Sequence, residues 1–451
     1  MTTAPTAVPG LLPVTGPASA PVSGGVVSSY RTERRKLAAQ LSTRLLALLC
    51  ALGPFAFAGV LGAQSGSPAD TLFGVWVHAS GFAVSLVVLG FAGSWGFPLV
   101  AGVLAGDIFS AEDRYGTWKT VLTRSCGRRE VFAGKVLAAA TFTLGLLTIT
   151  TISGLAAGWL LVGDQPLVGL GGQLITPGRS LVLVLAAWAL TALPALAFTS
   201  LAILFSVATR SGIAGVLGPA LVALLTQLLG LVGKGVWVHM LLIGSAFDLW
   251  HGLFAAPAFF GPLVVSAAVS VLWIAACLGA SWRLLRRRDF AGTHVAPRPG
   301  WVRPVRIVAV IIAGVAVLAV AGNWGPVGAT APRLQASLTP EFNNVSLDQQ
   351  RLIGRTVPPG ARLDLRPYCF RHSGPREGPG DWSCTLTVFV PQLGAVPFQQ
   401  TVVTYNVSVQ ANGCYKAESP PSFVGQQTMR TARGATVVNP LFVIYGCFSP
   451  L

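Results

Sequence analysis

The sequence predicts an all-α polytopic membrane domain, followed by a small β-rich domain that contains disulfides. Hydrophobic residues make up 53% of the 451 residues and charged residues only 10%, whereas soluble domains carry about 25% charge. Apolar stretches of the ~20 residues that cross a bilayer recur through the first part of the chain. From residue 323 the composition becomes that of a soluble domain, with stretches that alternate apolar and polar residues. The apolar content excludes a single soluble enzyme, and it excludes disorder over most of the length.

The first segments are a tail and a basic helix. Residues 1–27 carry no charge and contain five prolines, so we expect a flexible tail and not a signal peptide. Residues 28–43 hold Arg31, Arg34, Arg35 and Lys36. Because these charges fall on one side of a helix, we expect a helix on the inner membrane surface that leads into the first span.

A six-span core is predicted over residues 28–290. The spans are residues 45–63, 73–105, 136–162, 181–208, 213–232 and 262–282. The second stretch is too long for one straight span, and we expect the Gly and Pro residues of 93–98 to kink or split it, as Pro194 should kink the fourth. Residues 233–261 are apolar but interrupted, which predicts short re-entrant or interfacial helices. A linker and a short seventh span, residues 307–322, are expected within 291–322.

The basic residues predict the topology. The net charge is +16, but Lys and Arg cluster in alternate loops, which is the positive-inside pattern of membrane proteins and not a nucleic-acid-binding surface. The N-terminus is therefore expected in the cytoplasm of a multi-pass cell-membrane protein. A seventh span would place the C-terminal domain, residues 323–451, outside the cytoplasm.

Four cysteines, Cys369, Cys384, Cys414 and Cys447, lie in the C-terminal domain. Disulfides are typical of an extracytoplasmic domain, whereas a zinc site would need a CxxC or HxxxH spacing that the sequence lacks. Four cysteines allow three pairings. We favour the nearest neighbours, Cys369 with Cys384 and Cys414 with Cys447.

The inner segment between the second and third spans, residues 106–135, is the most informative part of the chain. Ser110 followed by Asp113 fits a capping box, so a helix should begin there. Tyr115, Trp118 and Leu122 then recur at helical spacing on one face. Such a helix would dock into a groove on a cytoplasmic partner or lie on the lipid headgroups, and the residues alone leave both interpretations open.

The chain has no motif for chemistry of its own. It contains no complete phosphate-binding loop, no HExxH, no GxSxG and no paired-carboxylate site. The spans hold almost no ionisable residues, which argues against a membrane-embedded enzyme or a proton-coupled transporter. Asp248 is the one acid of the outer apolar segment, and an interfacial salt bridge or plain solvation explains it as well as a function does.

The inner segment resembles that of ABC type-2 exporter permeases. The resemblance is carried by the ordered pattern Asp107, Ser110, Glu112, Gly116-Thr117, Leu122-Thr123-Arg124, Arg128-Arg129 and Gly134-Lys135. The layout agrees, since a surface helix precedes six spans and short outer helices lie between the last two. The resemblance covers roughly residues 28–288 and leaves out the seventh span and the cysteine-bearing domain.

The resemblance implies a transport subunit of an ATP-driven exporter and not an enzyme. It implies separate ABC ATPase subunits that bind ATP and Mg, no cofactor on this chain, and a second permease, identical or homologous, in the lipid bilayer. The implied ATPase contacts in the coupling loop are Asp107, Glu112, Gly116, Thr117, Trp118 and Lys119. The implied second contact consists of Glu33, Lys36 and Gln40.

An alternative is an envelope-anchored binding or sensor protein that acts through its extracytoplasmic domain. The spans would then serve only as an anchor or sensor. The coupling-like segment argues against it, because an anchor needs one span and not seven.

Overall fold

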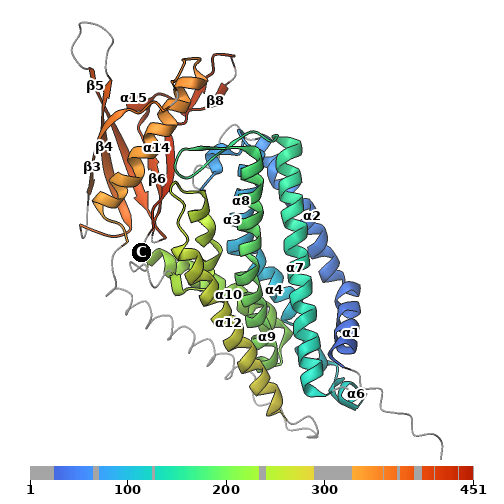
Figure 1. Cartoon of the computed structure of the whole chain (residues 1–451). Helices are drawn as coiled ribbons and strands as arrows, with labels where there is room; N and C mark the ends of the chain where they lie inside the picture. Colours follow the sequence, from blue (N-terminus) through green and yellow to red (C-terminus); the bar gives the residue numbers. More distant parts are fainter. Residues whose placement is uncertain are drawn as a thin grey trace, which may run out of the picture.

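The computed structural model consists of a helical bundle and a C-terminal domain packed at one end of it (Figure 1). It describes residues 25–63, 71–123, 127–232, 240–288, 328–358, 360–372, 376–390, 399–410, 412–434 and 436–449. Most of the expected tail, and the linker with the expected seventh span, lie outside the described residues.

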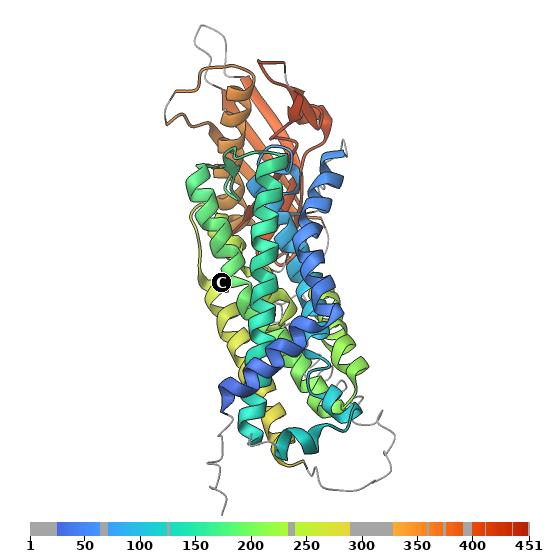
Figure 2. The ribbon, with the colours of Figure 1, turned by 90° about the vertical axis from the view of Figure 1, so that its right-hand side faces the viewer.

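The bundle contains the long apolar helices that the hydropathy pattern predicts. In the described part of the chain, six helical segments are long and apolar enough to cross a membrane. They are α2 (Leu41–Ala63), α3 to α5 (Gly81–Arg114), α7 (Arg128–Leu161), α8 with α9 (Pro177–Thr209), α10 (Gly212–Val232) and α12 (Gly261–Arg286). The preceding helix α1 (Val26–Ala39) lies obliquely across the lower end of the bundle (Figure 2).

Both expected helix interruptions are present. The second stretch divides into η1 (Gly74–Trp76), α3 (Gly81–Phe91), the π-helical turn η2 (Ala92–Gly96) and α4 (Phe97–Ala105). The fourth divides into α8 (Pro177–Leu190) and α9 (Ala192–Thr209). α8 ends four residues before Pro194 because a proline ring clashes with the carbonyl group one turn earlier.

Glycines bring two helix pairs into close contact. A Cβ atom added at Gly106, directly after α4, would overlap the backbone of Gly215 of α10, and one added at Gly81 of α3 would overlap Gly158 of α7. Small residues allow helix backbones to approach closely where lipid gives no hydrophobic driving force.

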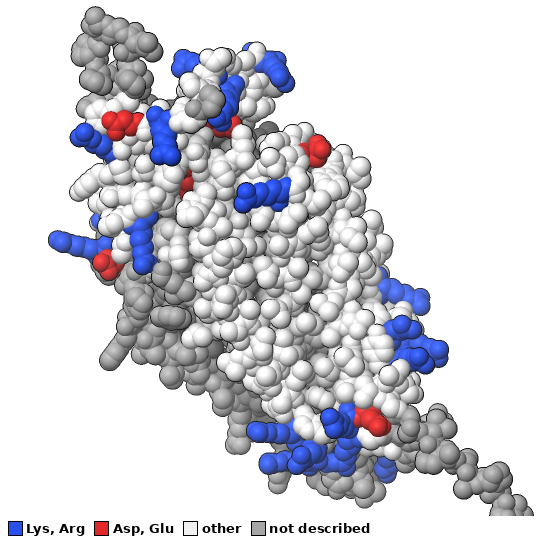
Figure 3. Space-filling view, viewed as in Figure 1, with Lys and Arg blue, Asp and Glu red and all other residues white. Residues whose placement is uncertain are grey.

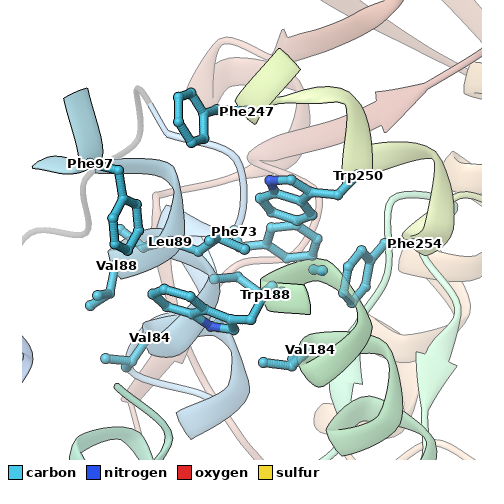
Figure 4. Packing of buried hydrophobic residues seen from close by; sticks show 14 of the residues in the cluster. Phe73, Val84, Val88, Leu89, Phe97, Val184, Trp188, Phe247, Trp250 and Phe254 are labelled. Atoms are coloured by element: carbon cyan, nitrogen blue, oxygen red, sulfur yellow. The ribbon is translucent and has the colours of Figure 1, made fainter. Parts of the chain in front are cut away.

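The end of the bundle near the C-terminal domain has an aromatic core. Short helices η3 (Gly244–Phe247) and η4 (Leu249–Phe254) lie here, as the interrupted apolar segment predicts. The Phe73 ring stacks on Trp250, with 6.2 Å between ring centroids, and meets Phe254 edge-on at 5.3 Å. Figure 4 shows these rings together, with Trp188 from α8 beside them.

The C-terminal domain has a five-stranded antiparallel sheet in the order β3-β4-β5-β6-β9. The strands are β3 (Asp364–Arg371), β4 (Gly380–Val390), β5 (Gln399–Val409), β6 (Cys414–Glu418) and β9 (Val443–Cys447). Smaller elements are α15 (Pro421–Val424), β7 (Thr428–Arg430) and β8 (Thr436–Val438). Disulfides join Cys369 to Cys384 and Cys414 to Cys447, which is the expected pairing.

Helix α14 (Ala331–Leu352) covers one face of this sheet and was missed by the β-rich prediction. Leu334, Leu338, Phe342 and Val345 form its buried side. Two prolines conceal it in the sequence: Pro332 stands in the first turn, where proline is tolerated, and Pro340 lies inside the helix.

The domain contacts the bundle through the hairpin of β1 (Leu167–Val168) and β2 (Leu174–Ile175) that follows α7. Asn344 of α14 donates a hydrogen bond from Nδ2 to the Gly171 carbonyl at 2.7 Å. Cysteine and apolar side chains of β6 and β9, such as Cys414 and Val443, join the bundle core. Lys and Arg gather at the far end of the bundle, beyond a broad uncharged band (Figure 3).

Candidate functional site

The segment that follows α4 forms two short helices at the basic end of the bundle. They are α5 (Ser110–Arg114) and α6 (Trp118–Thr123). The single amphipathic helix expected from the Tyr115, Trp118 and Leu122 spacing is wrong, because Gly116 takes a left-handed conformation with φ of 66° and turns the chain between the two helices. As a result Trp118 is buried, whereas Tyr115 is 71% exposed.

The expected capping box is wrong as well. A helix does begin at Ser110, the first residue of α5, but the Ser110 hydroxyl donates to Asp107 Oδ1 at 2.7 Å instead of capping the helix. The backbone N–H groups of Phe109 and Ser110 donate to Ser206 Oγ of α9 at 3.2 and 3.1 Å. The start of α5 is thus capped by a residue almost a hundred positions away in the sequence.

Next to this segment lies a buried ion cluster, made of Glu33 and Lys36 from α1, Glu112 from α5 and Lys135 from α7. Lys135 is only 1% exposed. Its Nζ lies 3.0 Å from Glu33 Oε1 and 3.1 Å from Glu112 Oε1, and it donates to the Ile108 carbonyl at 2.9 Å. Lys36 Nζ completes the cluster at 3.2 Å from Glu33 and 2.9 Å from Glu112.

The electrostatics of the cluster favour the charged state. Burial by itself lowers the pKa of Lys36, but hydrogen bonds and attraction from Glu112 and Glu33 outweigh it, so that the pKa is raised above its ordinary value. Two carboxylates and two ammonium groups compensate one another, which a buried lysine requires. The cluster therefore fastens α1, α5 and α7 together.

Close helix packing makes the cluster possible. A Cβ atom at Gly134 of α7 would overlap Ser29 and the Tyr30 backbone of α1. Gly134 thus lets α1 approach α7 closely, one position before Lys135. Thr117 adds a further hydrogen bond from its hydroxyl to Glu112, so that both carboxylate oxygens of Glu112 are engaged.

A second polar contact ties α6 to the end of α12. The Trp118 indole donates from Nε1 to Asp113 Oδ1 at 2.9 Å, and Arg288 forms an ion pair with the same carboxylate. The Arg288 guanidinium also lies 5.9 Å from the Trp118 ring centroid, within the range of a cation–π contact. Closer to the surface of the segment, Arg114 forms an ion pair with Asp107, with 2.5 Å between Nη2 and Oδ2.

The residues implied as ATPase contacts fall into two groups. Glu33, Glu112 and Trp118 are buried inside the chain, and Asp107 and Thr117 are partly buried. Gly116, Lys119, Lys36 and Gln40 are exposed. Tyr115 was not assigned a contact but is the most exposed aromatic residue of this segment. We define the exposed tip as Tyr115, Gly116 and Lys119.

This arrangement holds α1, α5, α6 and α7 in fixed positions relative to one another. The lysines engage the carboxylates of the buried ion cluster. No group of three or more His, Cys, Asp or Glu residues that could hold a metal ion occurs in the described ranges. The exposed tip therefore lies on two short helices that hydrogen bonds and ion pairs hold against the bundle.

An apolar groove lies farther along the bundle, between the π-helical turn with α4 and the facing helix α10. It has a volume of about 540 Å³ and is lined by Trp95, Leu99, Leu217, Leu221 and Leu224, among other apolar side chains. Several of these side chains are strongly exposed. At Gly218 the buried Phe205 ring packs directly against α10, because a Cβ atom there would overlap the ring.

Comparison with known proteins gives a match to a protein-family model. Residues 74–291 match the model of a family described as a protein of unknown function, DUF2705. The match begins at η1 and extends just past α12, so it includes α5, α6 and two of the four residues of the buried ion cluster, Glu112 and Lys135. No curated protein matches the chain.

Proposed function

We propose that the chain is the membrane-spanning permease subunit of an ATP-driven ABC exporter, coupled to a separate ATPase through the segment that contains α5 and α6. One observation supports this most strongly. The segment leaves a polar tip exposed, while Glu112, Asp113 and the backbone at the start of α5 are bonded to residues of α1, α7 and α9 and to Arg288 after α12. Such a surface can receive a partner and transmit the partner's movement.

The attachments suggest how movement would pass into the membrane. The buried ion cluster links α5 to α1 and α7, Ser206 links it to α9, and Arg288 links α6 to the end of α12. A displacement of the tip would therefore shift these helices together, as in rigid-body switching. ATP and Mg would act on the partner, whose closure supplies the free energy difference between the two states.

The two groups of residues would have different roles. Tyr115, Gly116 and Lys119, together with Lys36 and Gln40 on α1, would form the contact with the ATPase. Glu112, Glu33 and Trp118 would hold that surface in place from inside. The family resemblance supplies the partner class, and the burial of each side chain supplies this division of roles.

The transport path is proposed along the groove between α4 and α10. A second permease, identical or homologous, would cover the groove and complete the path. The apolar lining of Leu217, Leu221 and Leu224 suits an interface within lipid or a path for an apolar portion of the cargo.

The proposed orientation puts the basic end of the bundle in the cytoplasm and the C-terminal domain outside. Two independent observations support it. Lys and Arg gather at the end of the bundle away from the C-terminal domain (Figure 3), as the positive-inside rule requires. The two disulfides of that domain are typical of an oxidising compartment.

Copurification tests the proposal directly. Tagged protein extracted in mild detergent should carry a stoichiometric soluble subunit that has a phosphate-binding loop. The double variant Tyr115→Ala/Lys119→Glu should lose this subunit while its elution profile stays that of folded protein. Arg287→Glu, an exposed charge change at the same end, serves as the matched control. Folded protein that carries no ATPase would contradict the proposal.

The envelope-anchored binding or sensor protein is the second candidate. The observation that favours it is the C-terminal domain itself, which has its own core and a polar groove. Two results together would support this candidate over the exporter. Cells with the Tyr115→Ala/Lys119→Glu variant would behave as the wild type, whereas cells with a changed C-terminal groove would not.

A further inference from the structure

The C-terminal domain carries a polar groove on the face of its sheet that α14 does not cover. The groove has a volume of about 500 Å³, within the roughly 300–1,000 Å³ of small-molecule sites. Its lining is partly apolar, with Pro420, Pro421 and Phe442 at one end. Its polar lining comes from four neighbouring segments and includes His372, Asp381, Asn406, Ser408, Lys416 and Glu418. None of these side chains belongs to the buried ion cluster or to the groove between α4 and α10.

The polar side chains share one face because of strand alternation. In β5, Val403, Tyr405, Val407 and Val409 are buried under α14, so the residues between them point to the other face. Register brings Ser408 opposite Lys416 in β6 and opposite Asp381 in β4. The groove is therefore built across three strands and does not depend on a single loop.

A row of exposed rings continues from the groove along the edge strand. The Phe370 ring meets His372 edge-on at 5.1 Å, and Tyr368 lies 5.9 Å from Phe370. Tyr368 is 65% exposed and Phe370 is 40% exposed. Exposed aromatic rings on a soluble domain are a costly feature unless something covers them.

The charges of the groove are mixed and nearly balanced. Lys416 pairs with Glu418 at 3.2 Å, and Asp381 adds one exposed carboxylate. A phosphate or polyanion would need an excess of positive charge, which this lining lacks. A metal ion would need clustered ligands, and the described residues contain no such cluster. Amide, hydroxyl and carboxylate groups instead match the hydroxyl groups of a neutral polar ligand.

We propose that this groove and the adjoining rings bind a neutral oligosaccharide. Sugar hydroxyl groups would exchange hydrogen bonds with Asn406, Ser408 and Asp381. The apolar C–H faces of successive sugar units would lie against Phe370 and Tyr368, because an aromatic face attracts the positive edge of such a ring. This inference rests on the C-terminal domain alone and does not depend on the proposed exporter function.

A peptide strand fits this region less well. The edge strand β3 contains Pro367, which has no N–H group to donate to an added strand. The polar groove also lacks the alternating apolar pockets that select side chains of an extended peptide.

Binding by the full chain in lipid nanodiscs tests the proposal. Isothermal titration calorimetry would use three neutral probes, chitotetraose, cellotetraose and xylotetraose, each at millimolar concentration. Tetragalacturonate and tetra-alanine would serve as an acidic sugar and a peptide of similar length. We expect at least one neutral probe to bind and the other two classes to bind far more weakly.

Substitutions in the groove and the adjoining rings would show whether the sugar binds at this surface. Tyr368→Ala/Phe370→Ala should lower the affinity about tenfold, and Asn406→Ala about fivefold. All three side chains are exposed, so the domain should keep its fold. Val402→Ala, an exposed apolar change farther along β5, should leave the affinity unchanged.

Three outcomes would overturn the proposal. In the first, none of the three neutral probes binds. In the second, binding persists at full strength in both groove variants. In the third, the acidic sugar or the peptide binds more tightly than every neutral sugar and loses that binding in the groove variants.

Discussion

Two carboxyl groups are buried in very different surroundings, one in the bundle and one in the C-terminal domain. Glu112 lies between Lys36 and Lys135, with Nζ atoms at 2.9 and 3.1 Å. Glu341 of α14 accepts hydrogen bonds from Tyr415 at 2.6 Å and Ser337 at 3.3 Å, and no cation of the described residues pairs with it. The same side-chain type therefore joins helices by charge in one place and packs as a hydrogen-bonded group without a counter-ion among the described residues in the other.

The protonation of Glu341 follows from this difference. Burial raises its pKa well above the ordinary value of 4.5, and the hydrogen bonds from Tyr415 and Ser337 only partly oppose that shift. Burial and the nearby Glu341 likewise raise the pKa of Tyr415 well above its usual range, so its hydroxyl stays protonated and donates. Gly446 leaves the space that the Glu341 carboxyl occupies, since a Cβ atom there would overlap it.

The largest expected effect is in the buried ion cluster. Lys135→Met leaves Glu33 and Glu112 with only the half-exposed Lys36 as a counter-charge. Removing one partner of a buried ion pair costs ~3–5 kcal/mol in the free energy of unfolding. Thermal unfolding of the detergent-solubilised protein, followed by size exclusion, would measure the loss.

A double variant sharpens this test. Glu112→Gln/Lys135→Met removes one charge of each sign and should be more stable than Lys135→Met alone. Arg287→Met provides an exposed control at the same end. Equal stability of Lys135→Met and Arg287→Met would show that the cluster contributes nothing.

The disulfides come next, and their removal should affect chiefly the C-terminal domain. Cys414→Ser/Cys447→Ser opens a loop with a sequence separation of 33. The expected loss is ~3–4 kcal/mol in the free energy of unfolding of that domain. Limited proteolysis would measure this loss as faster cleavage of the C-terminal domain. The α5–α6 segment should be cleaved no faster than in the wild type.

Thiol labelling on intact cells provides the control for this prediction. The four cysteines of the C-terminal domain should resist labelling until a reductant is added. Labelling of all four without a reductant would contradict both disulfides.

The raised pKa of Glu341 predicts a pH dependence of stability. Because its folded-state pKa lies above the unfolded value of about 4.5, its contribution is complete below that pH and is lost as the pH rises toward the folded-state pKa. The stability of the C-terminal domain should then fall by up to ~1.4 kcal/mol per pH unit from this group. Unfolding followed between pH 5 and 8 would measure the slope.

Glu341→Gln keeps the size of the side chain and removes the titration. The slope should flatten in this variant, whereas Asp364→Asn, a change at an exposed acid of β3, should leave it as it is. An unchanged slope in Glu341→Gln would mean that Glu341 is charged in the folded domain.

The smallest effect on stability is expected at the exposed tip. Tyr115→Ala should change the free energy of unfolding by less than ~0.5 kcal/mol, because the ring is 71% exposed. Its effect should be on partner binding instead, measured as recovery of the ATPase in copurification. A large loss of stability would mean that the Tyr115 ring packs against the chain and is not free to contact a partner.

The sequence predicted what depends on local composition and spacing. Hydropathy located the long helices, Pro194 and the glycines of residues 93–98 located the interruptions, and neighbouring cysteines indicated the disulfide pairing. The geometry of the α5–α6 segment was not predictable in this way. The partners of Glu112 come from α1 and α7, and the cap of α5 comes from Ser206, so both depend on contacts between distant parts of the chain. Helix α14 was missed because prolines mask a helical spacing of apolar residues.

Helix α7 connects the end of the bundle that holds Glu112 with the end that contacts the C-terminal domain. Its 34 residues form a rod of about 51 Å, which exceeds the ~30 Å hydrocarbon layer. Near its start Lys135 anchors the rod to α1 and α5, and directly after its end the β1–β2 hairpin touches α14, the helix of Glu341. A stiff rod that slides or tilts at one end must do so at the other. Spin labels on α6 and α14 would therefore change their separation from neighbouring helices in step, although these two helices lie at opposite ends of the molecule (Figure 1).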